Sequence, residues 1–435
     1  MQLPEEFVSY TRKLMGDERF GKYLKSFDEE VPVSIRLNPL KMDVDNWKVE
    51  GGEPVPWCRN GYYLARRPNF TFDPLMHAGV YYVQEASSMF LDTVLRQHVV
   101  SDDSSTHSPL TMLDLCAAPG GKSTLARTVL PEGSTLYANE PIPQRASILA
   151  ENLQKWGWPD CIVTNNYPRD YLRSKLKFDI ILCDVPCSGE GMFRKDEATI
   201  REWSMQNVER CWRLQREIVS DAWACLSDNG LLVYSTCTLN TKENEENVRW
   251  ICEEFDAELL PVETRPEWNI TGSLLPGFTQ PVYRFIPGFT RGEGLFMAVL
   301  RKNGSSRPKA GHQESNVSSK GRKTVSSLKI LAPLLPSAIA QGGEAVAQVD
   351  LDYQTAIAYL RHEALSLPEG TPCGLVEVCF QGHPLGYAKN IGTRANNLYP
   401  KEWKIKTTHV PVEYETTLFS CMFHRKALSL HSQNY

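Results

Sequence analysis

The stretch from Thr111 to Ala126, TMLDLCAAPGGKSTLA, constrains the fold of this chain more than any other. It begins with an apolar strand pattern, continues through a turn of small residues and ends in the start of a helix. The turn, residues 116–121, has no bulky side chain, so a ligand can touch the main chain there. The helix start offers unpaired N–H groups and a positive dipole end, which favour an anion. The pattern predicts a nucleotide-like binding site.

Residues 121–124, GKST, look like the end of a phosphate-binding GxxxxGK[ST] loop. That loop requires glycine at position 116, where the chain has Cys116, and Pro119 removes one amide donor. We therefore set the NTPase interpretation aside. A tight strand-to-helix turn that binds nothing remains the alternative for this stretch alone.

The bulk properties limit the class of protein. With 435 residues, 42% hydrophobic and 23% charged, the chain has the composition of a globular protein with more than one domain. The net charge of −5 gives no global basic field, so any RNA binding requires a local patch. Twelve cysteines without a CxxC pair suggest reduced thiols and no structural zinc. Without an apolar signal core, we expect a cytoplasmic protein with no membrane segment and no metal.

Strand and helix patterns alternate from residue 110 onward, which predicts a largely parallel α/β sheet covered by helices. Predicted strands span 111–115, 135–139, 161–164, 178–183, 230–235 and 295–301, and the main helices span 143–156, 201–226 and 242–255. Ligands bind such sheets beyond the carboxyl ends of the strands. We take 101–302 as this domain, and 1–100 as a small N-terminal α/β domain with a helix from 81 to 99.

A C-terminal domain is predicted beyond a flexible linker. Residues 303–327 are rich in Ser, Lys, Arg and Gly, and 328–435 carry a helical pattern at 350–365 and two strands around 381–383. Five basic residues gather late in the chain, interleaved with Tyr399 and Trp403: Lys389, Arg394, Lys401, Lys404 and Lys406. This stripe favours contacts with RNA, although a solvated loop face is an equal alternative.

The predicted strand ends carry the chemistry. Glu140 follows the second strand, where nucleotide-binding sheets place a carboxylate that binds ribose hydroxyls. A dinucleotide is disfavoured because residues 116–121 are not GxGxxG. S-adenosylmethionine has a carboxylate for the helix start, and acidic groups such as Asp184 can face its cationic part.

Cys187 and Cys237 follow two other strands, and each alone is more often an inert thiol. Together beside Asp184 they suggest cytosine chemistry. A thiolate added to C6 activates C5 toward a methyl sulfonium, a second basic group then helps to remove the C5 proton, and an acid at N3 stabilises the developing charge. Asp184 is the candidate acid. Chemistry alone does not choose which cysteine is the nucleophile.

Three motifs, DLCAAPGGKST, DVPCSGEGMFRKD and YSTCTLNTKENEENV, resemble the Sun-type RNA cytosine-C5 methyltransferase family in their order. SIRLNPLK, PWCRNGYYL, YYVQEASSM and NNLYPKEWKIK are most similar to the bacterial 16S rRNA methyltransferases of the F type. The resemblance covers nearly the whole chain. It implies a class I methyltransferase (Rossmann-like) sheet, an N-terminal α/β domain like an RNA-recognition module and a C-terminal PUA-like RNA-binding domain.

The resemblance also implies site roles. Cys237 would be the nucleophile, Cys187 would release the product, and Lys122 would orient Asp184 or the base. S-adenosylmethionine would contact Glu140, Asp184 and the loop residues Cys116, Ala117, Ala118, Pro119, Gly120, Gly121 and Lys122. The family often has an aspartate after the third strand, for the adenine amino group. Here Asn166 takes that place, and its amide oxygen can also accept a hydrogen bond.

We expect an S-adenosylmethionine-dependent enzyme that forms 5-methylcytosine in RNA, acting as a monomer on 16S rRNA, free or in the 30S subunit. The enzyme alternative is the same chemistry on tRNA, because the catalytic motifs contact only the cytosine and the cofactor. The other alternative is an inactive rRNA-binding protein of ribosome assembly.

Overall fold

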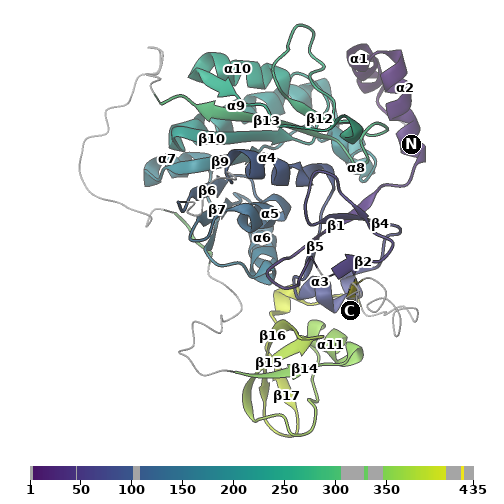
Figure 1. The fold of residues 1–435 in the computed structure, drawn as a ribbon, viewed down its shortest axis with the longest axis vertical. Coiled ribbons are helices and arrows are strands. Elements are labelled where there is room, and N and C mark those ends of the chain that lie inside the picture. The colour runs from purple at the N-terminus through teal and green to yellow at the C-terminus, as the bar shows by residue number, and fades with distance from the viewer. Residues whose placement is uncertain are drawn as a thin grey trace, which may run out of the picture.

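The computed structural model describes residues 3–45, 47–100, 108–304, 328–331, 346–407 and 423–425. Most of the predicted linker, 305–327, lies outside the described residues, as do 332–345, 408–422 and 426–435 of the predicted C-terminal domain. Figure 1 shows a central sheet with helices above and below it, an N-terminal part on one side and a small separate sheet beneath.

The central sheet contains all six predicted strands, in the order β11-β13-β10-β9-β6-β7-β8. The strands are β6 (Thr111–Asp114), β7 (Thr135–Asn139), β8 (Cys161–Thr164), β9 (Phe178–Asp184), β10 (Leu226–Thr236), β11 (Ala257–Leu259) and β13 (Leu295–Lys302), and β12 (Tyr283–Phe285) pairs with β13. The five strands from β10 to β8 are parallel, whereas β13 is antiparallel to β10. Strand order reverses at β6, which makes its carboxyl end the place for a ligand.

Helices bury both faces of this sheet. On β6, Met112 packs in a cluster with Leu91 and Leu125, whereas its neighbour Leu113 packs with Val219 and Val248 on the opposite face. The helices are α4 (Leu91–His98), α5 (Gly121–Val129), α6 (Pro143–Trp156), α7 (Pro168–Ser174), α9 (Met205–Cys225) and α10 (Glu245–Phe255). Burial on both faces explains the continuous apolar runs of these strands.

The N-terminal part has a four-stranded antiparallel sheet in the order β3-β4-β1-β5, with β1 (Val33–Leu37), β3 (Glu53–Pro54), β4 (Gly61–Leu64) and β5 (Tyr81–Val83). The predicted helix over 81–99 is wrong in its first part, because Tyr81 pairs with Leu37 and Val83 with Ile35. Pairing with the open edge of β1 overrides the local helical pattern. Helices α1 (Glu5–Met15) and α2 (Asp17–Lys25) pack through Phe7 and Phe20 against Phe193 and Trp203 instead.

The C-terminal part is a second four-stranded sheet, in the order β14-β15-β16-β17. Its elements are β14 (Ala347–Asp350), α11 (Tyr353–Leu360), β15 (Gly374–Phe380), β16 (His383–Asn390) and β17 (Ala395–Asn397). It packs on α3 (Pro74–His77) of the N-terminal part, where the Tyr353 hydroxyl donates to the Phe72 carbonyl at 3.0 Å. A short strand, β18 (Phe423–Arg425), pairs with β2 (Trp47–Val49).

The predicted basic and aromatic stripe is divided by the fold. Lys389, Arg394, Lys401, Lys404 and Lys406 are exposed, as expected. Tyr399 and Trp403 are 1% and 5% exposed and belong to the core, so the prediction that they join the stripe is wrong. Alternation along this segment turns the aromatic rings inward and the basic side chains outward.

Candidate active site

The loop of residues 116–121 leaves β6 at the point where strand order reverses. Gly120 has φ of 114°, a left-handed conformation that glycine adopts without strain, and α5 begins at the next residue. A Cβ at Gly120 would also meet the Leu149 side chain at 3.2 Å. The loop therefore keeps both its turn and its close packing only with glycine at this position.

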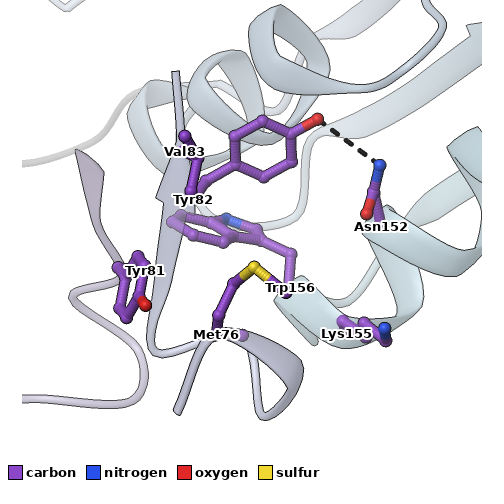
Figure 2. Close-up of a pocket in the computed structure, with 8 residues that line it drawn as sticks. Met76, Tyr81, Tyr82, Val83, Asn152, Lys155 and Trp156 are labelled. Atoms are coloured by element: carbon purple, nitrogen blue, oxygen red, sulfur yellow. Dashed lines mark hydrogen bonds between the residues drawn. The ribbon is translucent and has the colours of Figure 1, made fainter. Parts of the chain in front are cut away.

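Side chains of the N-terminal sheet and of α6 donate hydrogen bonds to this loop. The Pro119 carbonyl accepts hydrogen bonds from Asn152 Nδ2 at 2.7 Å and from the Tyr82 hydroxyl at 3.3 Å. Figure 2 shows both side chains beside a cavity of about 210 Å³ that Trp156 and Met76 also line. None of the predicted site residues lines this cavity, so it marks the junction between β5 and α6 rather than the chemical centre.

Lys122, in the first turn of α5 directly after this loop, forms an ion pair with Asp184. Lys122 Nζ lies 2.8 Å from Asp184 Oδ2, and the Ser235 hydroxyl donates to Asp184 Oδ1 at 2.5 Å. Asp184 ends β9 and pairs in register with Ser235 on β10, which fixes this arrangement. Burial lowers the pKa of Lys122, but the charge and hydrogen bond of Asp184 raise it more, so the net pKa is raised and the ammonium stays charged.

The two predicted cysteines lie together beside this pair of strands. Their sulfur atoms, Cys187 Sγ and Cys237 Sγ, are 3.2 Å apart, and the Cys237 N–H donates to Cys187 Sγ at 3.3 Å. The hydrogen bond with the Cys237 thiol, followed by burial, raises the pKa of Cys187 well above its ordinary range. Cys187 therefore keeps its proton at neutral pH and can donate it toward Cys237.

Glu140 lies at the end of β7 and is 1% exposed. Its Oε1 accepts a hydrogen bond from the Ile142 N–H at 3.0 Å, and its Oε2 lies 3.5 Å from Arg145 Nη2. These contacts hold the carboxylate beyond the strand end, at the edge of the sheet where the loop of residues 116–121 also lies.

Asn166 is already engaged by the segment 328–331. The Lys329 N–H donates to Asn166 Oδ1 at 3.0 Å, and Asn166 Nδ2 donates to the Lys329 carbonyl at 3.1 Å. An adenine amino group would therefore share Oδ1, whose second lone pair can accept it. Sequence reasoning did not anticipate this partner, because Lys329 is 163 residues away in the chain.

These residues fit S-adenosylmethionine. The α5 start suits a carboxylate, Glu140 suits the ribose hydroxyls, and Asp184 suits the cationic part. To these predicted residues the structure adds Asp114, which ends β6 just before the loop. Asp114 is 1% exposed, and its Oδ1 has no hydrogen-bond partner among the described residues. An acidic residue that ends an apolar strand just before the loop was the signal that sequence reasoning passed over.

Burial of Asp114 predicts a pH dependence of stability. Burial chiefly raises the pKa of Asp114 from 3.8 to about 7, although the Ser123 hydroxyl opposes this. The contribution of Asp114 to the free energy of unfolding is complete below the pKa that it has in the unfolded chain. This contribution is lost as pH rises through the pKa that Asp114 has in the folded protein. In the unmutated protein, the free energy of unfolding should therefore fall by roughly 2 to 3 kcal/mol between pH 5 and 7. In the Asp114→Asn variant this fall should be absent. Thermal melts of both proteins across this range measure the difference.

The control for this prediction is Glu202→Gln on the exposed face of α8 (Glu197–Glu202), which should melt with the pH profile of the unmutated protein. An Asp114→Asn profile that parallels the unmutated one would show that Asp114 ionises normally in the folded protein.

Membrane spans and metal clusters are both absent from the described residues. No described helix is both long and apolar enough to cross a membrane. Across 3–45, 47–100, 108–304 and the later described ranges, no group of three or more His, Cys, Asp or Glu residues could hold a metal ion.

Sequence profiles of known families match three parts of the chain. The family described as 16S rRNA methyltransferase RsmB/F matches residues 105–301. The N-terminal domain of 16S rRNA methyltransferase RsmF matches residues 3–86, and the methyltransferase RsmF PUA domain matches residues 346–405. The three matches occur in this order along the chain and together cover most of it.

Individual relatives agree with these profiles. The chain is 28% identical to ribosomal RNA small subunit methyltransferase F of Erwinia tasmaniensis, over 92% of this chain and 96% of that protein. It is 32% identical to the protein of the same name from Pectobacterium atrosepticum, over 70% of this chain but only 64% of that protein.

Solved structures share the fold. A methyltransferase homolog protein from Pyrococcus horikoshii, 26% identical, superposes with a TM-score of 0.54 over 69% of this chain and all of that one. NSun6 from the same organism, 22% identical, gives 0.55 over 69% of this chain and 98% of that one. The predicted fold class is confirmed: a Rossmann-like methyltransferase sheet with an added N-terminal domain and a C-terminal PUA domain.

Proposed function

The chain belongs to the 16S rRNA methyltransferase RsmB/F family, and from that premise we propose that it forms 5-methylcytosine in small-subunit rRNA in the cytoplasm, using S-adenosylmethionine. One observation carries the proposal: two thiols 3.2 Å apart, at the strand ends that also hold the Asp184–Lys122 ion pair. Methylation at C5 of cytosine requires a nucleophile at C6 and a proton acceptor near C5, and paired thiols supply both.

S-adenosylmethionine, when bound, supplies an electrophilic methyl group. The loop residues 116–121, Glu140 and Asp184 would hold its carboxylate, ribose and cationic part, with Asn166 at the adenine. The chain's own task is then to place cytosine C5 opposite this site and to exclude water while the base is activated. Removing the target cytosine from its stack costs roughly a few kcal/mol, which contacts with the RNA-binding domains must offset.

Cys237 is the proposed nucleophile. The family resemblance gives this role to Cys237, and the raised pKa of Cys187 keeps Cys187 protonated beside it. Its sulfur adds to C6 of cytosine and the thiol proton passes to N3, and Asp184 with the charged Lys122 stabilises the charge at that edge. The electron pair displaced to C5 would then bond to the methyl group, and the electrons of the broken methyl–sulfonium bond would stay on the sulfur of the cofactor.

Cys187 is proposed to release the product. Once the Cys237 sulfur is bonded to C6, its hydrogen bond and charge no longer raise the Cys187 pKa, although burial and the charge of Glu243 still do, so Cys187 gives up its proton to water more readily than before. Its thiolate takes the C5 proton, the electrons of that bond re-form the C5–C6 double bond, and the Cys237 thiolate leaves and takes back the proton from N3. The short distance between the sulfurs suits attack on adjacent ring atoms.

The proposal is tested by methyl transfer from labelled S-adenosylmethionine to 30S particles, 16S rRNA and tRNA, followed by mass spectrometry of the nucleosides. We expect 5-methylcytidine in rRNA. Product in tRNA alone would favour the tRNA alternative. RNA binding without any turnover would favour the assembly-protein alternative.

The exposed lysines of the C-terminal part are expected to contact RNA phosphates. Replacing Lys401 and Lys404 with alanine should weaken rRNA binding several-fold and reduce the slope of log K against log salt by about one for each phosphate that is no longer neutralised. Filter binding over a range of KCl concentrations measures both quantities. Glu402→Gln, between the two lysines, is the control and should not weaken binding. An unchanged salt slope in the lysine variant would mean that this face is only solvated.

A further inference from the structure

Two buried glutamates connect the loop that carries Cys187 with the loop that carries Cys237, and each glutamate bonds to the backbone of the other loop. Glu190 lies in the loop that carries Cys187, yet its Oε2 accepts the N–H groups of Leu239 and Asn240 at 2.8 and 3.0 Å, in the loop that carries Cys237. Glu243 follows Cys237, yet its Oε2 accepts the Ser188 N–H at 3.0 Å, beside Cys187. Each loop thus supplies the carboxylate that fixes the backbone of the other.

Asn240 connects the two carboxylates. Its Nδ2 lies 3.1 Å from Glu190 Oε1 and 2.8 Å from Glu243 Oε1. Direct contacts also cross between the loops, with the Ser188 and Thr238 hydroxyls 2.9 Å apart and the Gly191 N–H donating to the Cys237 carbonyl at 2.7 Å. Glu190, Asn240 and Glu243 are each at most 2% exposed, so this network lies beneath the thiols rather than in contact with solvent.

Resting on the proposed function, we propose that Glu190, Asn240 and Glu243 are positioning residues that hold the thiols of Cys187 and Cys237 together for adduct formation and release. Burying two carboxylates close together is costly, and apolar side chains would serve stability alone at least as well. The same cost appears in Glu243, where burial and then the charge of Glu190 raise the pKa to about 7. What the carboxylates provide is a fixed direction for backbone groups on both sides of the sulfur pair.

Disulfide formation between Cys187 and Cys237 measures their positions without requiring methyl transfer. Diamide takes up the two protons and two electrons that the thiols release, and peptide mass spectrometry quantifies the linked pair. Glu190→Gln and Glu243→Gln each put an amide donor among groups that already donate. We expect the full-length variants to form the disulfide about tenfold more slowly, and to lose about 10- to 100-fold in kcat with KM for S-adenosylmethionine unchanged.

Two further variants complete the experiment. Glu202→Gln, exposed on α8, is the matched control and should keep the unmutated disulfide rate. Thr238→Val removes one crossing hydroxyl with little change in shape, and we expect it to slow the disulfide about threefold. If the glutamine variants do not fold, Thr238→Val becomes the test of the proposal. A rate of disulfide formation in Thr238→Val equal to that of the unmutated protein would then overturn the proposal.

Disulfide rates in folded glutamine variants equal to that of the unmutated protein would also overturn it. Slower disulfide formation in the variants, with no methyl transfer by the unmutated protein, would instead support the positioning role and reject the proposed function.

Discussion

The Cys187→Ala variant is expected to accumulate a covalent protein–RNA adduct when it is mixed with S-adenosylmethionine and rRNA. Cys237 can still add to C6 and activate C5, but no thiolate lies next to it to take the C5 proton, so the bond between sulfur and C6 persists. A denaturing gel with labelled RNA should show RNA that migrates with protein, and sequencing of that RNA names the substrate.

The Cys237→Ala variant should form no adduct and should lose methyl transfer by more than about 10³-fold, because the nucleophile itself is gone. Cys252→Ala is the control, since Cys252 is a partly exposed thiol on α10 outside the site. Its adduct formation and its methyl transfer should equal those of the unmutated protein. An adduct from Cys237→Ala and none from Cys187→Ala would reverse the two roles. If neither variant traps RNA and the unmutated protein transfers no methyl group, the assembly-protein alternative takes the lead.

The second large effect is expected on stability, at Arg284 of β12. Arg284 and Glu245 are both fully buried and form a two-pronged ion pair, in which Arg284 Nε donates to Glu245 Oε1 at 2.8 Å and Arg284 Nη2 pairs with Glu245 Oε2. Arg284 Nη1 also donates to the Leu239 carbonyl at 2.7 Å, just beyond Cys237. Arg284→Met would leave a buried carboxylate unpaired, at a cost of about 3 to 5 kcal/mol.

A loss of that size should lower the melting temperature by roughly 10 °C, which calorimetry can measure. Replacing both partners, as Arg284→Met with Glu245→Leu, should recover much of the loss, because no buried charge is then unpaired. Lys22→Met, at an exposed ion pair with Glu18, is the control and should melt as the unmutated protein does. A melting temperature of Arg284→Met within about 1 or 2 °C of the unmutated value, the effect expected for a surface pair, would contradict this account.

The sequence by itself determined the central sheet and the location of its chemistry. Strands such as β7 and β8 and the helix α6 have the bounds that periodicity predicted, because their apolar patterns are local and strong. Cys187 and Cys237 could be predicted to meet, since both follow parallel strands whose carboxyl ends share one edge of the sheet. Their roles as nucleophile and releasing group rest on family resemblance and stay proposals.

Only the tertiary structure decided what depends on contacts between distant segments. The edge of β1 made Tyr81–Val83 a strand, and burial in the C-terminal core removed Tyr399 and Trp403 from the basic face. The crossed contacts of Glu190 and Glu243 link positions about 50 residues apart, and those of Asn166 with Lys329 span 163. Local patterns report the preferences of a segment alone, whereas burial and hydrogen-bond partners are set by which segments the folded chain brings together.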